Sequence, residues 1–273
     1  MTTASVAIDP YAEAGPVSPV RFLYRLNPLA KLLAPAPAML TLVFVRDLAT
    51  PLVFLALAYA VVLVGARMTV RLALILFAVI PLLVALLGVA FGLWTDPAGV
   101  AGTPALVRVG GWTLYAGAVQ IGFATGLRLA AIVALALIAG LTTTGPDLAR
   151  SLVQQLRVPY RVGYTAIAAF RFVPRFRREL DIIRQAHRVR AAGARRGPFA
   201  AIARGFGYIV PLLAGAIRHA ERVALAMDAR AFGAYPTRTE RHRVPWRVRD
   251  TVFTVLMLTA SASVFWLLFP WTP

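Results

Sequence analysis

The chain has 273 residues, 59% of them hydrophobic, and carries 29 Lys+Arg against 11 Asp+Glu for a net charge of +18. Soluble domains are typically about 45–50% apolar, so this composition indicates a chain that faces lipid, and it argues against a nucleic-acid binder despite the basic charge. Cysteine is absent, which excludes disulfides and thiolate metal sites. The one lysine, Lys31, has no glycine-rich loop around it, which excludes a P-loop ATPase.

The N-terminal residues 1–24 are predicted to be a flexible cytoplasmic tail. They are not expected to be a signal peptide, because 1–20 lack the basic start and apolar core that a signal peptide needs. A membrane-spanning helix needs about 20 apolar residues. Five stretches approach that length: about 29–45, 48–66, 72–94, 112–141 and 251–269. Pro35 and Pro37 predict a kink or an irregular start in the first stretch. We therefore expect an all-α integral membrane protein, with four spans in 25–141 and a last one in 250–273.

The arginines orient these spans. Residues 157–249 hold 20 arginines and five acids, and the loops expected on the same side hold Arg67 and Arg71. The loops on the opposite side contribute only Arg46 and Arg108 as basic residues. By the positive-inside rule, five spans place the N-terminus in the cytoplasm and the C-terminus outside. The expected location is the plasma membrane of a prokaryote.

Residues 142–249 are predicted to form a cytoplasmic module of amphipathic helices. Thr144 can cap a helix start, and Pro146 suits its first turn. Pro159 ends that run, after which 160–190 interleave apolar and basic residues at helical spacing. The apolar stretch 205–217 is too short to span comfortably, and we expect a helix buried against other protein.

Two helix ends within this module each offer an arginine among small residues. Arg230 falls in the last turn of a helix that ends near Gly233, and Arg190 occupies a similar place 40 residues earlier. The simpler interpretation is a cation that stabilises the negative end of its helix, or a basic surface helix on anionic lipid. The functional interpretation is a pair of plugs for grooves on a partner, since the guanidinium fork favours interface ion pairs.

With these features in order, the chain resembles the transmembrane T component of energy-coupling factor importers for vitamins and metal ions. The resemblance rests on LNPLAKLL (26–33), TTTGPDLARSL (142–152), LRVP (156–159) and the long stretches 170–193 and 208–233. The family's Ala-Arg-Gly signatures map onto two triplets: Val189, Arg190 and Ala191, then Ala229, Arg230 and Ala231. Both triplets end in alanine where the family has glycine, and Arg195 or Arg196 offers a rival register for the first.

The resemblance implies a non-catalytic coupling subunit that has no cofactor of its own. Its partners would be two ABC-type ATPase subunits, a small membrane protein that captures the substrate, and the lipid bilayer. Arg190 and Arg230 would insert into grooves of the ATPases, and ATP-driven closure would move the two coupling helices. The substrate, and whether the two ATPases are identical, stay open.

Arg128 interrupts the fourth apolar stretch. A charge within a membrane helix costs at least about 2.5–3.5 kcal/mol, so it either contacts a polar group of the bundle or another subunit, or it snorkels at a break in the span. Two rival functions stay open for the whole chain. One is a stand-alone secondary transporter or channel, and the other is a membrane-embedded lipid-modifying enzyme, which would need clustered carboxylates or a Ser/His/Asp set.

Overall fold

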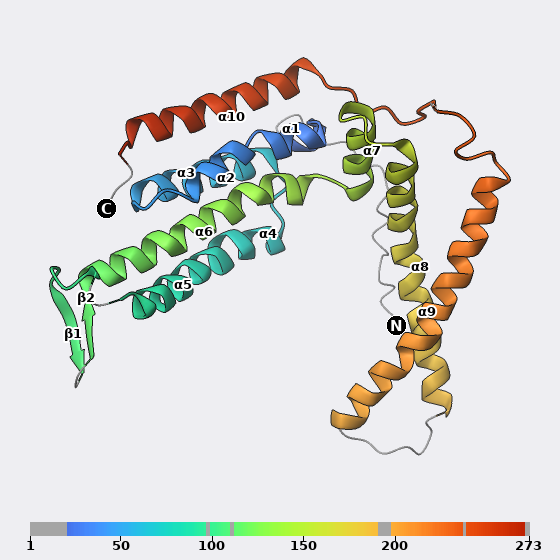
Figure 1. Ribbon diagram of the computed structural model, residues 1–273, viewed down its shortest axis with the longest axis horizontal. Coiled ribbons are helices and arrows are strands. Elements are labelled where there is room, and N and C mark those ends of the chain that lie inside the picture. The colour runs from blue at the N-terminus through green and yellow to red at the C-terminus, as the bar shows by residue number, and fades with distance from the viewer. Residues whose placement is uncertain (1–20, 97–98, 110–111, 191–197, 237–238, 271–273) are drawn as a thin grey trace. The chain divides into compact units, whose positions relative to one another are not determined.

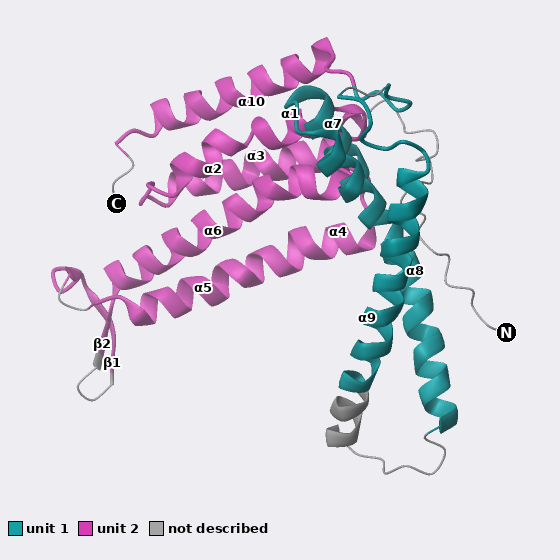
Figure 2. Cartoon of the chain, turned by 45° about the vertical axis from the view of Figure 1, so that its right-hand side comes forward, with its two compact units in different colours: residues 1–12, 145–244 teal, residues 13–144, 245–273 magenta. Residues whose placement is uncertain are grey.

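The computed structural model describes residues 21–96, 99–109, 112–190, 198–236 and 239–270. The chain divides into two compact units (Figure 2). We call them the apolar unit, residues 13–144 and 245–273, and the basic unit, which contains residues 145–244. The chain therefore leaves the apolar unit after Thr144 and returns to it at Pro245, and each unit is described by itself below.

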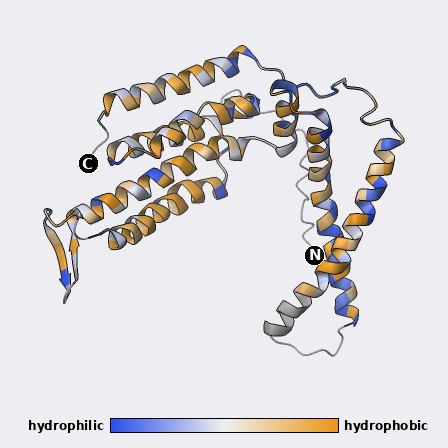
Figure 3. Ribbon diagram, viewed as in Figure 1, coloured by the Kyte–Doolittle hydropathy of each residue, from blue (hydrophilic) through white to orange (hydrophobic). Residues whose placement is uncertain are grey.

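The apolar unit is built from helices and one small hairpin (Figure 1). Its elements are a 3₁₀ turn (Phe22–Arg25), α1 (Pro28–Leu33), α2 (Ala36–Leu42), α3 (Ala49–Gly65), α4 (Val70–Leu74), a π-helical turn (Ile75–Val79), α5 (Ile80–Trp94), β1 (Ala105–Val109), β2 (Trp112–Tyr115), α6 (Ala116–Thr142) and α10 (Val248–Leu267). Most residues of these helices are hydrophobic (Figure 3).

Within the described ranges, three helical stretches are long and apolar enough to cross a membrane: Val70–Trp94, Ala116–Thr142 and Val248–Leu267. The other two predicted spans form shorter apolar helices, Pro28–Leu42 and Ala49–Gly65. The class expected from sequence, an all-α membrane protein, is confirmed. The first of the short stretches breaks between α1 and α2 at Pro35, in agreement with the irregularity predicted there.

The start predicted for the fourth span is wrong by four residues. Residues 112–115 form β2, which pairs antiparallel with β1 in a hairpin, and α6 begins only at Ala116. Trp112, Thr113 and Tyr115 belong to the residue types that favour strands, and pairing with β1 satisfies backbone groups that an isolated segment would leave open. An apolar count cannot separate such a strand from the helix that follows it.

Helices α5 and α6 approach closely enough for their backbones to touch. A Cβ atom added to Gly122 would lie 2.2 Å from the carbonyl oxygen of Gly88 and 2.5 Å from the nitrogen of Gly92. One added to Gly126 would lie 2.8 Å from the carbonyl oxygen of Val84. Each helix thus brings two glycines four residues apart to the crossing, the arrangement that permits tight packing between membrane helices.

Larger side chains fill the other side of α6. Leu135 and Ile138 are fully buried there, together with Phe54 of α3. The ring of Phe54 stacks at 4.9 Å from that of Phe265, which brings α10 onto α3. The core of the apolar unit is therefore gathered around α6, with α5 on its glycine face and α3 on its larger residues.

The basic unit consists of α7 (Gly145–Gln155), α8 (Tyr160–Arg190) and α9 (Pro198–Asp228). The break predicted at Pro159 lies between α7 and α8, where Arg157 has a left-handed backbone with φ of 55°. A Cβ on Gly163 would lie 2.1 Å from a methyl of Val153, so α8 folds back closely onto α7.

The apolar stretch 205–217 is the middle of α9 rather than a separate short helix. Five of its large side chains are more than half exposed in this chain: Phe206, Ile209, Val210, Leu213 and Ile217. Burial of this stretch against another protein stays a prediction, because this chain does not cover it.

We expect Gly122→Ala to lower the free energy of unfolding by about 1–3 kcal/mol, because its methyl group must push two backbones apart. The matched control is Gly140→Ala in the same helix, where an added Cβ meets no atom within 4 Å. That change should be neutral or stabilising by up to about 1 kcal/mol. Thermal unfolding of the detergent-purified variants, followed by tryptophan fluorescence, measures both. Equal melting temperatures would contradict the close helix contact.

Candidate functional site

The end of α9 has a defined cap that contains the Arg230 triplet. The N–H of Phe232 donates to the carbonyl of Met227 at 3.0 Å, and that of Ala231 donates to the carbonyl of Asp228 at 2.9 Å. This pair of bonds is the Schellman arrangement, with Ala231 in the left-handed position at φ of 53°. Arg230 occupies the C-cap, and its side chain is exposed.

The left-handed conformation of Ala231 gives a physical reason for the glycine that the resemblance leads us to expect at this position. An L-residue in this conformation costs roughly 1–2 kcal/mol relative to its right-handed form, and glycine is spared most of that cost. Ala231 therefore adopts the same turn as a glycine would, under strain. The substitution changes the stability of the turn and leaves its shape intact.

Contacts with the start of α8 hold this turn in place. The ring of Phe232 lies 5.7 Å from that of Tyr160 and 6.4 Å from that of Tyr164, both edge-on. The Tyr160 hydroxyl donates to the carbonyl of Tyr235 at 2.7 Å, and Arg161 donates to the carbonyl of Gly233. The turn is thus attached to the first two turns of α8, and we call these contacts the clasp. Arg230 lies next to the clasp in sequence and is exposed.

The second candidate triplet lies at the end of α8. Arg190 is the last residue of that helix and is exposed, and the preceding Val189 is 79% exposed. Ala191, and the rival arginines at 195 and 196, lie outside the described residues. Among the residues that the structure describes, neither Arg190 nor Arg230 takes part in an ion pair.

Helices α8 and α9 run antiparallel and cross (Figures 1 and 2). Ring contacts pair His187 with Tyr208 at 5.0 Å and Phe172 with His219 at 4.2 Å, so the end of α8 lies beside the start of α9. At about 1.5 Å of rise per residue, the stretch of α8 from the clasp to Arg190 is roughly 40 Å long. The structure therefore does not bring the two arginines together: it places them at opposite ends of one helix pair.

A basic cleft of about 810 Å³ opens beside Arg230. Its described lining contains four arginines and two histidines and no carboxylate: Arg150, Arg171, Arg230, Arg241, His219 and His242. Desolvation of the His219 ring lowers its pKa below the ordinary value, and Arg175 and Arg222 lower it further against the opposing effect of Glu179. The lowered pKa favours the neutral form of His219, so the positive charge of the cleft comes chiefly from the arginines.

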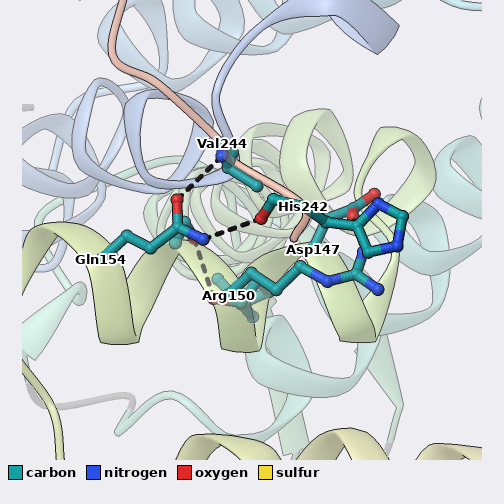
Figure 4. A network of polar contacts seen from close by, with 7 residues as sticks. Asp147, Arg150, Gln154, His242 and Val244 are labelled. Carbon is teal, nitrogen blue, oxygen red and sulfur yellow. Dashed lines mark hydrogen bonds and ion pairs between the residues drawn. The ribbon is translucent and has the colours of Figure 1, made fainter. Parts of the chain in front are cut away.

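A polar network fixes one wall of this cleft (Figure 4). The Gln154 amide donates to the carbonyl of His242 at 2.9 Å and accepts the N–H of Val244 at 2.8 Å. On the same face of α7, Arg150 pairs with Asp147 at 2.7 Å. The segment after α9 is thus tied to α7, in addition to the clasp on α8, so the surroundings of Arg230 are held from two helices.

Arg128 contacts polar groups of its own unit, which is one of the alternatives that the sequence left open, although the sequence did not identify its partners. Its guanidinium donates to the carbonyls of Val43 at 3.2 Å and Val45 at 2.9 Å, just beyond the end of α2. A helix end leaves its last carbonyls without partners, which is costly in an apolar environment. The contact of Arg128 is therefore a backbone cap within the apolar unit. The signal was present in the sequence as a single charge in an apolar run, but its acceptors lie more than 80 residues away.

Comparisons with known proteins agree on one family. The family model described as cobalt transport protein, CbiQ, matches residues 19–241. The transmembrane protein EcfT of the Staphylococcus aureus energy-coupling factor transporter is 29% identical over 168 residues, which cover 59% of this chain and 63% of that protein. The Thermotoga maritima EcfT is 36% identical over 109 residues, 40% of each chain. These alignments span less than two thirds of either relative.

A longer relative aligns with nearly the whole chain. An ABC transporter ATP-binding protein of Bifidobacterium longum is 28% identical over 271 residues, which cover 96% of this chain and 34% of that protein. The match therefore occupies about a third of a larger polypeptide that is named for ATP binding.

Glycine substitutions at the two alanines around Arg230 should act in opposite directions. Ala231→Gly relieves the left-handed strain and should raise the free energy of unfolding by about 0.5–1 kcal/mol. Ala229→Gly places glycine in an ordinary helical turn, where Ala229 N–H donates to the carbonyl of Leu225 at 2.9 Å, and should lower it by a similar amount. Melting temperatures of the two purified variants provide the measurement. A loss of stability in both would contradict the assigned cap.

Proposed function

Because the chain belongs to the CbiQ family of cobalt transport proteins, we propose that it is the transmembrane coupling subunit of an energy-coupling factor importer for a vitamin or a metal ion. One observation carries this proposal. The α8–α9 pair presents an exposed arginine at each of its two ends, and neither arginine has an acidic partner in the described chain. Two separated cationic helix ends suit two partner sites of the same kind.

The partners that fit these ends are two ATPase subunits, each with an acidic groove. The cleft beside Arg230 supports this, since its described lining contains four arginines and no carboxylate, and burying such a surface requires opposite charge from a partner. The printed names of the relatives, a transporter transmembrane protein and a longer ATP-binding protein, point to the same kind of assembly. This subunit would then be non-catalytic, with ATP hydrolysis carried out by the partners.

The mechanism follows from the antiparallel geometry. An ATPase dimer that closes on ATP would bring its two grooves together and change the crossing of α8 and α9, a shift between two packed arrangements driven by differential binding. The exposed apolar stretch of α9 would hold a small membrane protein that captures the substrate. In this proposal the tail is 1–24 and the first four spans lie in 25–141. The coupling module, 142–249, follows them, and the last span lies in 250–273. The module would lie on the cytoplasmic side of a prokaryotic plasma membrane, with the C-terminus outside.

The test of the assembly is affinity purification of the tagged chain from its own host membranes, followed by mass spectrometry and an ATPase assay. We expect a nucleotide-binding ATPase and a small integral membrane protein in the eluate, with ATP hydrolysis. Recovery of the chain alone, active in transport by itself, would overturn the proposal in favour of a stand-alone carrier.

Charge reversal at both helix ends tests the arginines. We expect Arg190→Glu with Arg230→Glu to reduce recovery of the ATPase at least about 100-fold, because an acidic groove would repel both ends, while membrane insertion is unchanged. The matched control is Arg218→Glu with Arg222→Glu, an identical change in net charge at exposed positions in the body of α9. Equal loss in both double variants would show a general electrostatic effect and would contradict docking through the helix ends.

A further inference from the structure

The only lysine of the chain is buried in the apolar unit. Lys31 in α1 is 1% exposed. The remaining residues of the Lys+Arg total are all arginines. Its Nζ donates to the carbonyl of Thr142 at 2.7 Å. Thr142 is the last residue of α6, where the helix leaves carbonyls without intrahelical donors and where its dipole is negative. Burying an ammonium group without a hydrogen-bond acceptor is costly, so the folded state strongly favours this contact.

One turn earlier, Asn27 holds a second segment. Its side chain accepts the N–H of Leu29 at 2.9 Å and so caps α1. The backbone N–H of Asn27 donates to Oδ1 of Asp250 at 2.7 Å, and Asp250 is 1% exposed. The other oxygen of Asp250 accepts the N–H of Arg247 at 2.7 Å at the start of α10. The Asn27 amide also lies 3.5 Å from the carbonyl of Pro245, as a weak donor.

These contacts lie at both places where the chain passes between the two units. Thr142 lies two residues before the exit from the apolar unit, and Pro245 is the first residue after the return. Asn27 and Lys31 are four residues apart around one short helix, a spacing at which side chains share a face. A single turn of α1 therefore holds the outgoing connection through Lys31 and the returning one through Asn27 and Asp250.

We propose that the turn from Asn27 to Lys31 is the anchor through which movements of the basic unit are delivered to the membrane helices. In this inference, which rests on the proposed coupling function, Lys31 and Asp250 are positioning residues. A displaced α8–α9 pair pulls on two connections, and each is fixed to the same helix turn by a buried charged group. Without these bonds, the last turn of α6 and the first turn of α10 could fray, and the displacement would be absorbed in the connections.

Lysine suits this place better than arginine because its compact ammonium fits one carbonyl at a helix end, whereas a guanidinium needs room for a planar fork. Methionine has a similar length and no donor. Lys31→Met therefore removes the bond and keeps most of the volume. Because the chain contains no native cysteine, a spin label reacts only with the cysteines that are introduced into it.

The experiment uses the complete complex purified from host membranes, with cysteines introduced for spin labels at exposed Leu86 of α5 and Leu225 of α9. A second pair, at Ile182 of α8 and Leu225, reports movement within the basic unit. Pulsed dipolar distances are recorded with ADP and with a non-hydrolysable ATP analogue. In Lys31→Met we expect the Leu86–Leu225 distribution to become at least about twofold broader. The response of the Ile182–Leu225 pair and the ATPase rate should stay within about twofold of those of the parent.

The matched control is Arg128→Met, which also removes a cation from backbone carbonyls at a helix end but lies away from both connections. It should lower thermal stability without broadening the Leu86–Leu225 distribution, a separation that a merely structural role of Lys31 would not produce. Unchanged widths in Lys31→Met, or equal broadening in Arg128→Met, would overturn the anchor.

A second variant keeps the test decisive if Lys31→Met does not accumulate. Asp250→Asn keeps the shape of the cap and removes its charge, and it should broaden the same distribution. If neither variant accumulates in the membrane, the cluster is a folding element and the anchor proposal fails. If the parent chain recovers no ATPase, the proposed coupling function fails instead, and the label widths of the chain alone still report on the anchor.

Discussion

The close contact between α5 and α6 is the constraint on which the apolar unit depends. Gly122 of α6 faces the backbone of Gly88 at a distance that no side chain permits. In lipid there is little hydrophobic force between helices, so association relies on this kind of van der Waals fit. With α5 fixed on one side of α6, the larger residues around Leu135 remain free to pack α3 and the rest of the unit.

Four cations of this chain illustrate two different kinds of surroundings. Lys31 and Arg128 lie in the apolar unit and donate to carbonyls at the ends of helices, where an unsatisfied carbonyl is expensive. Arg190 and Arg230 are exposed at the ends of α8 and α9. The first group satisfies backbone carbonyls within the apolar unit, and the second is where we propose that a partner binds. Function in the proposed importer requires both, because a force applied at the helix ends is useful only if the connections transmit it.

The turn around Arg230 shows how a family pattern acquires a physical cause. The Schellman bonds place Ala231 in a left-handed conformation, and the clasp of Phe232 on Tyr160 and Tyr164 holds that turn on α8. The glycine at Gly233 predicted a helix end here. It did not show that Phe232 attaches this end to a different helix.

The sequence by itself determined the class of the protein, the apolar stretches, the break at Pro35 and the helix ends that offer Arg190 and Arg230, because hydropathy, proline geometry and capping are local. It misplaced the start of α6, since an apolar strand and an apolar helix have similar composition over four residues. Only the tertiary structure decided that Arg128 caps α2, that Lys31 meets Thr142, and that α8 and α9 run antiparallel with their arginines far apart. Each of these depends on which distant backbone groups come within hydrogen-bonding or packing distance, and that is settled by the packing of whole helices.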